Sequence, residues 1–233
     1  MSKMSRRGFV GQAAVGLAAL AALGGEPAEA QLVYKRSDWS VKEFDELLHV
    51  PARARQVYDV IGIGAGKFLN NIKNSLNGLQ FGFGIPPQQI RILAALHGPA
   101  NLLNYDDYVW QKYRIGEWLK ETDSQTGKLA VRNPYYLSKI GKNGSRDPQQ
   151  ENSIYQDISV QGLQARGVKF LSCHTALEEQ ARALVGHFKL SQPREEIVKD
   201  LLAHALPGVL VVASMVASLV LLQSEGHYTY IKV

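Results

Sequence analysis

The feature of this chain that most constrains its fold is an alternation of short apolar strand patterns with amphipathic helix patterns. Strand patterns are expected at 54–61, 89–96, 168–171, 209–212 and 228–232. Helix patterns are expected at 38–48, 67–79, 106–120, 154–165, 175–188, 195–204 and 214–223. Near-continuous apolar strands between helices are typical of a parallel sheet covered by helices on both faces. The sequence therefore predicts an α/β fold with a mainly parallel, five-stranded sheet.

A polar stretch interrupts this alternation. Residues 121–152 show no clear period and contain turn residues such as Gly127, Pro134 and Pro148. We expect an insertion there that serves as a lid or an oligomer contact. We assign 31–53 to an N-terminal extension and 54–233 to one α/β domain, because its length suits a single domain.

The N-terminus has the three parts of an export signal in the right order. Arg6 and Arg7 form a twin-arginine pattern, an apolar run follows at 13–23, and Ala28-Glu29-Ala30 fits a cleavage site. The alternative is a permanent membrane anchor, but the run is shorter than the roughly 20 residues that a spanning helix needs. We therefore predict a twin-arginine (Tat) signal peptide at 1–30 and a periplasmic or secreted protein.

The run 206–222 is uncharged and mostly apolar, so a transmembrane helix is one interpretation of it. Pro207 and Gly208 stand at its head, however, and the rest divides into a buried strand and a helix. We therefore expect no stable membrane span after cleavage of the signal.

The chain has a single cysteine, which excludes an intramolecular disulfide. Cys173 follows an apolar strand pattern and precedes a helix in which Thr175 and Glu178 are spaced as a capping box. The free N–H groups and positive end of a helix favour a thiolate, so Cys173 is a candidate accessible and reactive thiol. The alternative is a small buried apolar side chain, the commoner state of a free cysteine.

Two histidines are further candidates for the site. His97 follows the second strand and could act as a base or orienting group for Cys173, and a cationic His174 would favour the thiolate. The alternatives are a turn imidazole bonded to nearby backbone for His97 and an outward-pointing ring for His174. Ligands of parallel sheets bind at the carboxyl ends of the strands, where these residues are expected. No Cys and His spacing fits a metal site, so we expect no metal or other cofactor.

Other function classes receive less support. The net charge of +5 is scattered without a basic, aromatic stripe, which argues against nucleic-acid binding. The turn 62–66 is glycine-rich but lacks the full dinucleotide-binding spacing, so a nucleotide site there competes with close helix packing. No Ser, His and Asp set can be identified from residue order, which leaves hydrolase activity little supported.

Three segments of the chain share a known pattern: the strand and turn around Cys173, the strand end and turn at 94–99, and the tail 207–232 with its final Tyr230-Ile231-Lys232. In these segments the chain resembles the DsrE/DsrF-like family of sulfur-relay proteins. The resemblance implies a flavodoxin-like three-layer sandwich and a homo-oligomer, often a trimer or hexamer. It also implies that Cys173 carries sulfur as a persulfide. The export signal and the insertion at 121–152 depart from the family pattern.

The leading hypothesis from the sequence is an exported protein that binds or relays sulfane sulfur through Cys173, with a donor or acceptor protein as partner. One alternative is a non-catalytic oligomeric binding or assembly module with a buried structural cysteine. Another is a small-molecule or nucleotide binder that uses the turn 62–66.

Overall fold

The computed structural model describes residues 36–141 and 143–233, which belong to one compact unit, Lys35–Val233. The predicted signal peptide at 1–30 lies outside the described residues. Within them, five strands form one sheet: β1 (Ala54–Val60), β2 (Ile90–Leu96), β3 (Lys169–Cys173), β4 (Leu210–Val212) and β5 (Thr229–Lys232). Every pairing is parallel and the strand order is β4-β3-β2-β1-β5. This confirms the predicted α/β fold.

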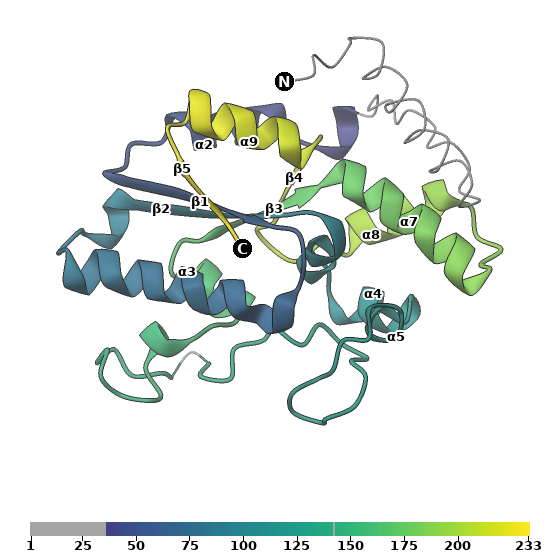
Figure 1. The fold of residues 1–233 in the computed structure, drawn as a ribbon, viewed down its shortest axis with the longest axis horizontal. Helices are drawn as coiled ribbons and strands as arrows, with labels where there is room; N and C mark the ends of the chain where they lie inside the picture. The colour runs from purple at the N-terminus through teal and green to yellow at the C-terminus, as the bar shows by residue number, and fades with distance from the viewer. Residues whose placement is uncertain (1–35, 142) are drawn as a thin grey trace, which may run out of the picture. The chain divides into compact units, whose positions relative to one another are not determined.

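Helices cover both faces of the sheet. They are α2 (Val41–His49), α3 (Lys67–Asn77), α4 (Asp107–Lys112), α5 (Ile115–Leu119), α6 (Val160–Ala165), α7 (His174–Phe188), α8 (Arg194–Ala203) and α9 (Met215–Ser224). Figure 1 shows α2 and α9 on one side of the sheet and α3 on the other. The structure is therefore the three-layer sandwich expected from the sequence.

Alternating strand residues divide the core into two parts. Val57, Leu171 and their neighbours pack with the apolar sides of α2 and α9. Tyr58, Phe170 and the other alternate residues pack with α3 and with α4 to α8. Burial on both faces explains why an interior strand such as β2 is largely apolar rather than alternating with polar residues.

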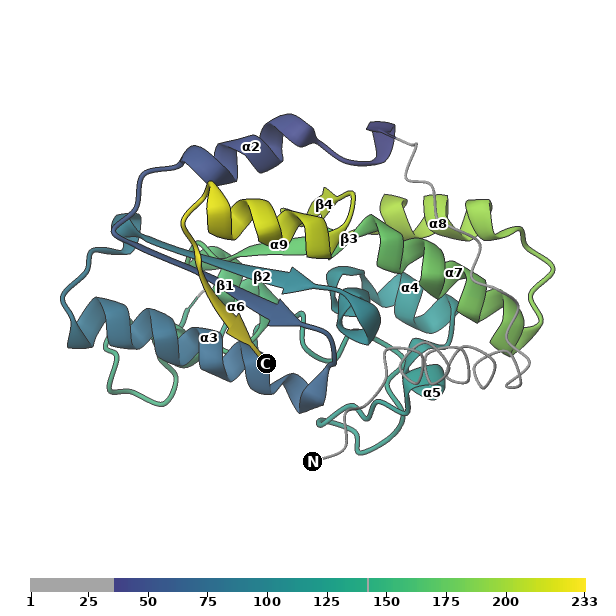
Figure 2. The ribbon, with the colours of Figure 1, turned by 45° about the horizontal axis from the view of Figure 1, so that its top comes forward.

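The connections between strands use both faces. Figure 2 shows α9 lying above the sheet while the chain runs from β4 to β5 at the opposite edge. The chain leaves β3 into α7, which packs mainly in the α3 layer, but it leaves the adjacent β4 into α9 on the other face. The carboxyl ends of β3 and β4 therefore form a topological switch point, where open α/β sheets bind ligands.

Several helix boundaries differ from the sequence prediction. The helix expected at 154–165 is a 3-10 turn, Ile154–Gln156, followed by α6, and the helix expected at 38–48 begins at Val41. The helix expected at 106–120 is divided into α4 and α5, because Arg114 adopts a left-handed conformation with φ 50°. Helix α7 begins at His174, with Cys173 itself as the N-cap, so the predicted capping box at Thr175 is wrong. The hydroxyl of Thr175 instead donates to the carbonyl of Ala213, 3.0 Å away.

The apolar run 206–222 divides as predicted into a strand, β4, and a helix, α9. Across the described residues, none of the helices has both the length and the apolar character needed to span a bilayer.

The insertion at 121–152 contains only isolated bridges in its described part, such as Thr122 with Leu129. It is nevertheless joined to the domain, because the Tyr135 ring packs against the first core and its carbonyl accepts the Val160 N–H at 2.9 Å. The insertion therefore packs against the starts of α3 and α6.

Candidate functional site

The only cysteine of the chain lies at the switch point. Cys173 is the last residue of β3, and its register partner is Val212, the last residue of β4. Its side chain belongs to the core between the sheet and α9, and the residue is 4 % exposed in the isolated chain. The structure therefore places the predicted thiol at the expected edge of the sheet, formed by the carboxyl ends of the strands and called the rim below. The thiol is buried there rather than open to solvent.

Two helix N-termini converge on the sulfur of Cys173. Its Sγ accepts the N–H of Ala176, in the first turn of α7, at 3.4 Å. It also accepts the N–H of Met215, the first residue of α9, at 3.3 Å. These are orphan donors at the positive ends of two helix dipoles, so both stabilise negative charge on the sulfur.

A buried amide fixes the backbone on either side of this sulfur. The Asn101 Oδ1 accepts the Cys173 N–H at 2.9 Å and the Ser172 hydroxyl at 3.0 Å. Its Nδ2 donates to Gln180 Oε1 at 3.2 Å, and Gln180 in turn donates to the Gly98 carbonyl at 2.6 Å. The network connects the end of β3 with the turn that follows β2.

Tyr105 extends the same hydrogen-bond network through Ser172, near the end of β3. Its hydroxyl lies 2.7 Å from the Ser172 Oγ, and the residue is fully buried. Burial raises the pKa of Tyr105 above its ordinary value, so the phenol is neutral and available as a donor.

His174 neither points outward nor contacts solvent. The residue is 1 % exposed, its Nε2 lies 2.9 Å from Asp38 Oδ2, and Trp39 packs edge-on against the ring. Its Nδ1 has no hydrogen-bond partner among the described residues, although Glu178 Oε1 lies 3.7 Å away. The segment just before α2 therefore covers the histidine that follows Cys173.

His97 is paired with a carboxylate rather than with Cys173. Its Nε2 lies 2.6 Å from Asp59 Oδ1, and the other oxygen of Asp59 accepts the Tyr230 hydroxyl at 2.5 Å. The three residues come from β1, the turn after β2, and β5. The hydrogen bond to Asp59 raises the pKa of Tyr230 above its ordinary value, which keeps the hydroxyl protonated as a donor.

Strand register places His97 and Cys173 at the same end of the sheet. The last pair between β2 and β3 is Leu96 with Ser172, and His97 and Cys173 are the next residue of each chain segment. Between them runs the side-chain network through Asn101 and Gln180. Both candidate residues therefore lie on the rim, but in separate surroundings. Cys173 contacts two helix N-termini, whereas His97 contacts the carboxylate of Asp59.

The glycine-rich turn at 62–66 is partly closed. A Cβ on Gly66, which has φ +71°, would lie 2.5 Å from the Tyr135 ring, so close packing explains this glycine. A Cβ on Gly62 or Gly64 would meet nothing within 4 Å, so that part of the backbone is open.

Sequence reasoning missed several residues of this rim. Asp59 stands inside a buried strand, and a charge at such a position is itself a signal of a polar partner. Asn101, Gln180 and Tyr230 give no comparable signal, because their partners are distant in sequence. Asp38 gives no signal either, because its contact with His174 joins segments that are far apart in the sequence.

No cluster of three or more His, Cys, Asp or Glu side chains suited to a metal ion occurs in the described part of the chain. Comparison with known proteins finds no matching family model, no matching curated protein and no matching solved structure.

Proposed function

We propose that this chain is an exported protein that takes up sulfane sulfur on Cys173 as a persulfide and passes it to an acceptor. The observation that carries the proposal is the pair of backbone N–H groups, from Ala176 and Met215, that both donate to the Cys173 sulfur. A thiolate is the reactive form of cysteine, and donors at two helix N-termini favour it.

The chemistry needs no cofactor. The Cys173 thiolate attacks the terminal sulfur of a polysulfide, a new S–S bond forms, and the shortened polysulfide leaves with the electron pair of the broken bond. When an acceptor thiolate later takes the outer sulfur, the electron pair returns to the Cys173 Sγ. The same two N–H groups stabilise that leaving thiolate.

Two features of the sequence support this assignment. The segments around Cys173 and the tail resemble the sulfur-relay family, and the residues at 1–30 have the order of parts of a Tat signal. A lone cysteine in an oxidising compartment also needs protection from unwanted pairing, which its position below α9 provides.

The burial of Cys173 favours a second candidate, an oligomeric binding or assembly module with a structural cysteine. At 4 % exposure the sulfur resembles an ordinary core thiol, and exposed apolar residues on α9 offer a contact surface. Val216 and Val220 are 65 % and 61 % exposed. This candidate needs no reactive sulfur.

Intact-mass spectrometry of the protein after polysulfide treatment separates the two candidates. Since Cys173 is the only cysteine, sulfur-relay activity predicts a mass gain of one sulfur atom that dithiothreitol removes and Cys173→Ser abolishes. Val212→Ala, at the register partner, serves as a control that loosens the packing but keeps the thiol. A mass unchanged until denaturant is added would make Cys173 structural.

A further inference from the structure

A cavity lies at the end of the sheet opposite the rim. Ile90, the first residue of β2, lines it, so the cavity is beside the amino ends of the strands and away from Cys173. Its volume is about 200 Å³, whereas roughly 10–15 Å³ is enough for one water molecule. One part of its wall is apolar and another part is polar, from Leu76, Pro87 and Ile90 and from Gln80, Tyr155 and Arg166. The cavity can therefore take a small organic molecule that has both apolar and polar groups.

Arg166 supplies a positive charge to this wall. Its guanidinium lies over the Tyr155 ring, 5.1 Å from the ring centroid. It donates to the Asn77 Oδ1 at 2.8 Å and to the Tyr155 carbonyl at 3.4 Å. A guanidinium has five N–H donors. Because the described residues accept two of these bonds, three donors remain for a ligand.

No carboxylate neutralises this charge directly. Among the described residues, none of the acidic side chains forms an ion pair with Arg166, and none lines the cavity. Burial lowers the pKa of Arg166 below its ordinary value, and interactions with Tyr155 and Asp157 offset only part of this effect. A partly desolvated cation without a counter-ion favours an anionic ligand, and a carboxylate matches the planar fork of its N–H groups.

The backbone beside the cavity has a rare conformation. Directly after α3, residues Gly78–Gly82 form a π-helical turn, which contains the lining residue Gln80. Such turns are uncommon and are frequently found at functional sites. The Phe81 ring of this turn packs edge-on against Tyr155, with ring centroids 4.9 Å apart. Contacts with both Phe81 and Arg166 therefore hold the Tyr155 ring in place and fix one wall of the cavity.

We propose that this cavity binds a small carboxylic acid with an apolar body. The carboxylate pairs with the free N–H donors of Arg166, and the hydrocarbon part packs against Leu76, Pro87 and Ile90. The charge-assisted hydrogen bonds and the removal of apolar surface from water both contribute to the affinity. The site lies apart from Cys173 and does not depend on the sulfur chemistry proposed for that residue.

Isothermal titration calorimetry with three small molecules tests the site. Hexanoate has both the carboxylate and the chain, acetate has only the carboxylate, and hexanol has only the chain. We expect hexanoate to bind at least about tenfold more tightly than either of the others, because each of them lacks one of the two contacts. Hexanol binding as tightly as hexanoate, or no binding of hexanoate at millimolar concentration, would overturn the proposal.

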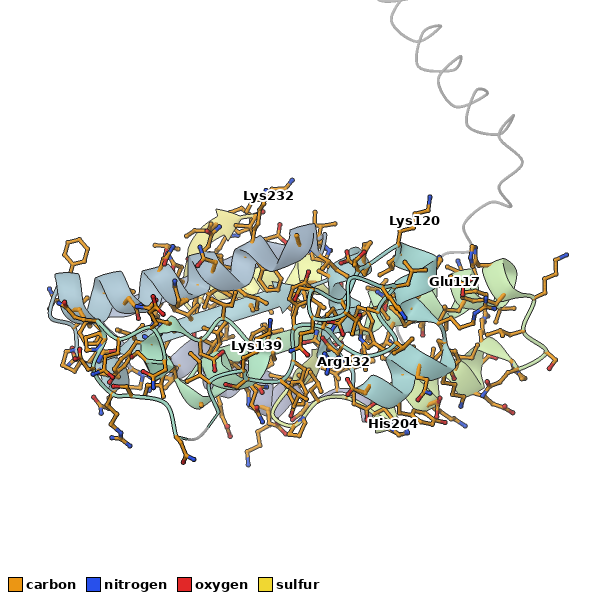
Figure 3. The ribbon with its side chains drawn as sticks, turned by 90° about the horizontal axis from the view of Figure 1, so that it is seen from below. Glu117, Lys120, Arg132, Lys139, His204 and Lys232 are labelled. Carbon is orange, nitrogen blue, oxygen red and sulfur yellow. The ribbon has the colours of Figure 1, made fainter. Side chains whose placement is uncertain are left out.

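A charge-removing variant assigns the binding to Arg166. Arg166→Gln should weaken hexanoate binding about tenfold and leave hexanol binding unchanged. Lys120→Gln is the control, because it also removes one positive charge, from a side chain that lies outside the cavity lining and that Figure 3 shows extending away from the protein. The control should bind hexanoate like the parent protein. Equal affinities of the two variants for hexanoate would contradict the assignment.

A cavity-filling variant keeps the arginine and removes the space. Ala165 lines the cavity and is exposed, so Ala165→Phe can occupy it without disturbing the core. This variant should lose hexanoate binding and keep the urea-denaturation midpoint of the parent protein, and it decides the question if Arg166→Gln does not fold. Hexanoate binding unaltered by Ala165→Phe would place the ligand elsewhere and overturn the proposal.

Discussion

At the scale of single residues, Asn101 joins several buried groups of the rim through its side-chain hydrogen bonds. It is fully buried, and its side chain bonds the backbone of Cys173, the Ser172 hydroxyl and Gln180. Since buried polar groups depend on such partners, removal of one amide leaves several of them unsatisfied at once. The position of the thiol is therefore fixed by a residue that touches only its backbone.

We predict that Asn101→Ala lowers the free energy of unfolding by roughly 2–4 kcal/mol, because each unpaired buried partner costs about 1–3 kcal/mol. Urea denaturation measures the loss. Asn70→Ala, at an exposed position of α3, is the control and should change stability by less than about 0.5 kcal/mol. Equal midpoints for the two variants would show that the network contributes little.

The sequence predicted where the candidate residues lie better than it predicted their hydrogen-bond partners and burial. Cys173 and His97 were expected at strand ends, and both lie there. The partner of His97 could not be predicted, because Asp59 and Tyr230 meet only after β5 has paired with β1. The burial of Cys173 could not be predicted from the sequence either, because it depends on the packing of α9 over the end of β3.

At the scale of secondary-structure elements, the turn between β1 and α3 combines two constraints at Gly66. Its φ of +71° is left-handed, and the ring of Tyr135 occupies the place of a side chain. The first constraint belongs to the turn itself, whereas the second belongs to the insertion that packs on it. Gly62, four residues earlier, has neither constraint.

We therefore predict that Gly66→Ala destabilises the protein by about 2–4 kcal/mol, through left-handed strain and a clash with Tyr135. Thermal and urea denaturation measure the effect, and Gly62→Ala should be nearly neutral. Adding Tyr135→Ala to Gly66→Ala should recover part of the loss that the two changes would cause separately. Additive losses would show that the ring does not press on this position.

The strand patterns located all five strands of the sheet within the described residues. Burial on both faces leaves apolar runs in β2, β3 and β4, whereas the edge strand β5 is mostly exposed. Helix ends were harder to predict. The break at Arg114 is a left-handed residue without a glycine, so no local signal marks it. Helix α7 begins at His174 rather than at the predicted Thr175, because the Cys173 sulfur accepts the Ala176 N–H and so caps the helix. Cysteine is not among the preferred N-cap residues, so the sequence did not indicate this start.

At the scale of the whole molecule, α9 is apolar on its outer side as well as its inner side. Met215, Leu219 and Leu222 are buried against the sheet, while Val216 and Val220 are exposed one helical turn apart. A helix that is apolar all round is usually buried. We expect this outer side to lie in an interface between copies of the chain.

We predict that the protein is a homo-oligomer and that Val220→Glu shifts it toward the monomer, because a charge replaces an apolar contact. Light scattering at micromolar concentration measures the mass. Phe83→Glu, at a position 75 % exposed between α3 and β2 and outside the insertion, is the control and should leave the mass unchanged. A monomeric wild-type protein would contradict the assignment.

The pairing of β5 with β1 has a consequence for folding. Gln56 pairs with Thr229, so the interior strand β1 receives its second neighbour from the strand that lies furthest from it in the sequence. Such distant pairing slows folding, because the entropy of closing a long loop is lost before the strand contacts form. Until β5 pairs, β1 has an unpaired edge, and an unpaired strand edge is a template for pairing with another chain. The short strand β5 therefore protects an interior strand of the sheet from association with other molecules.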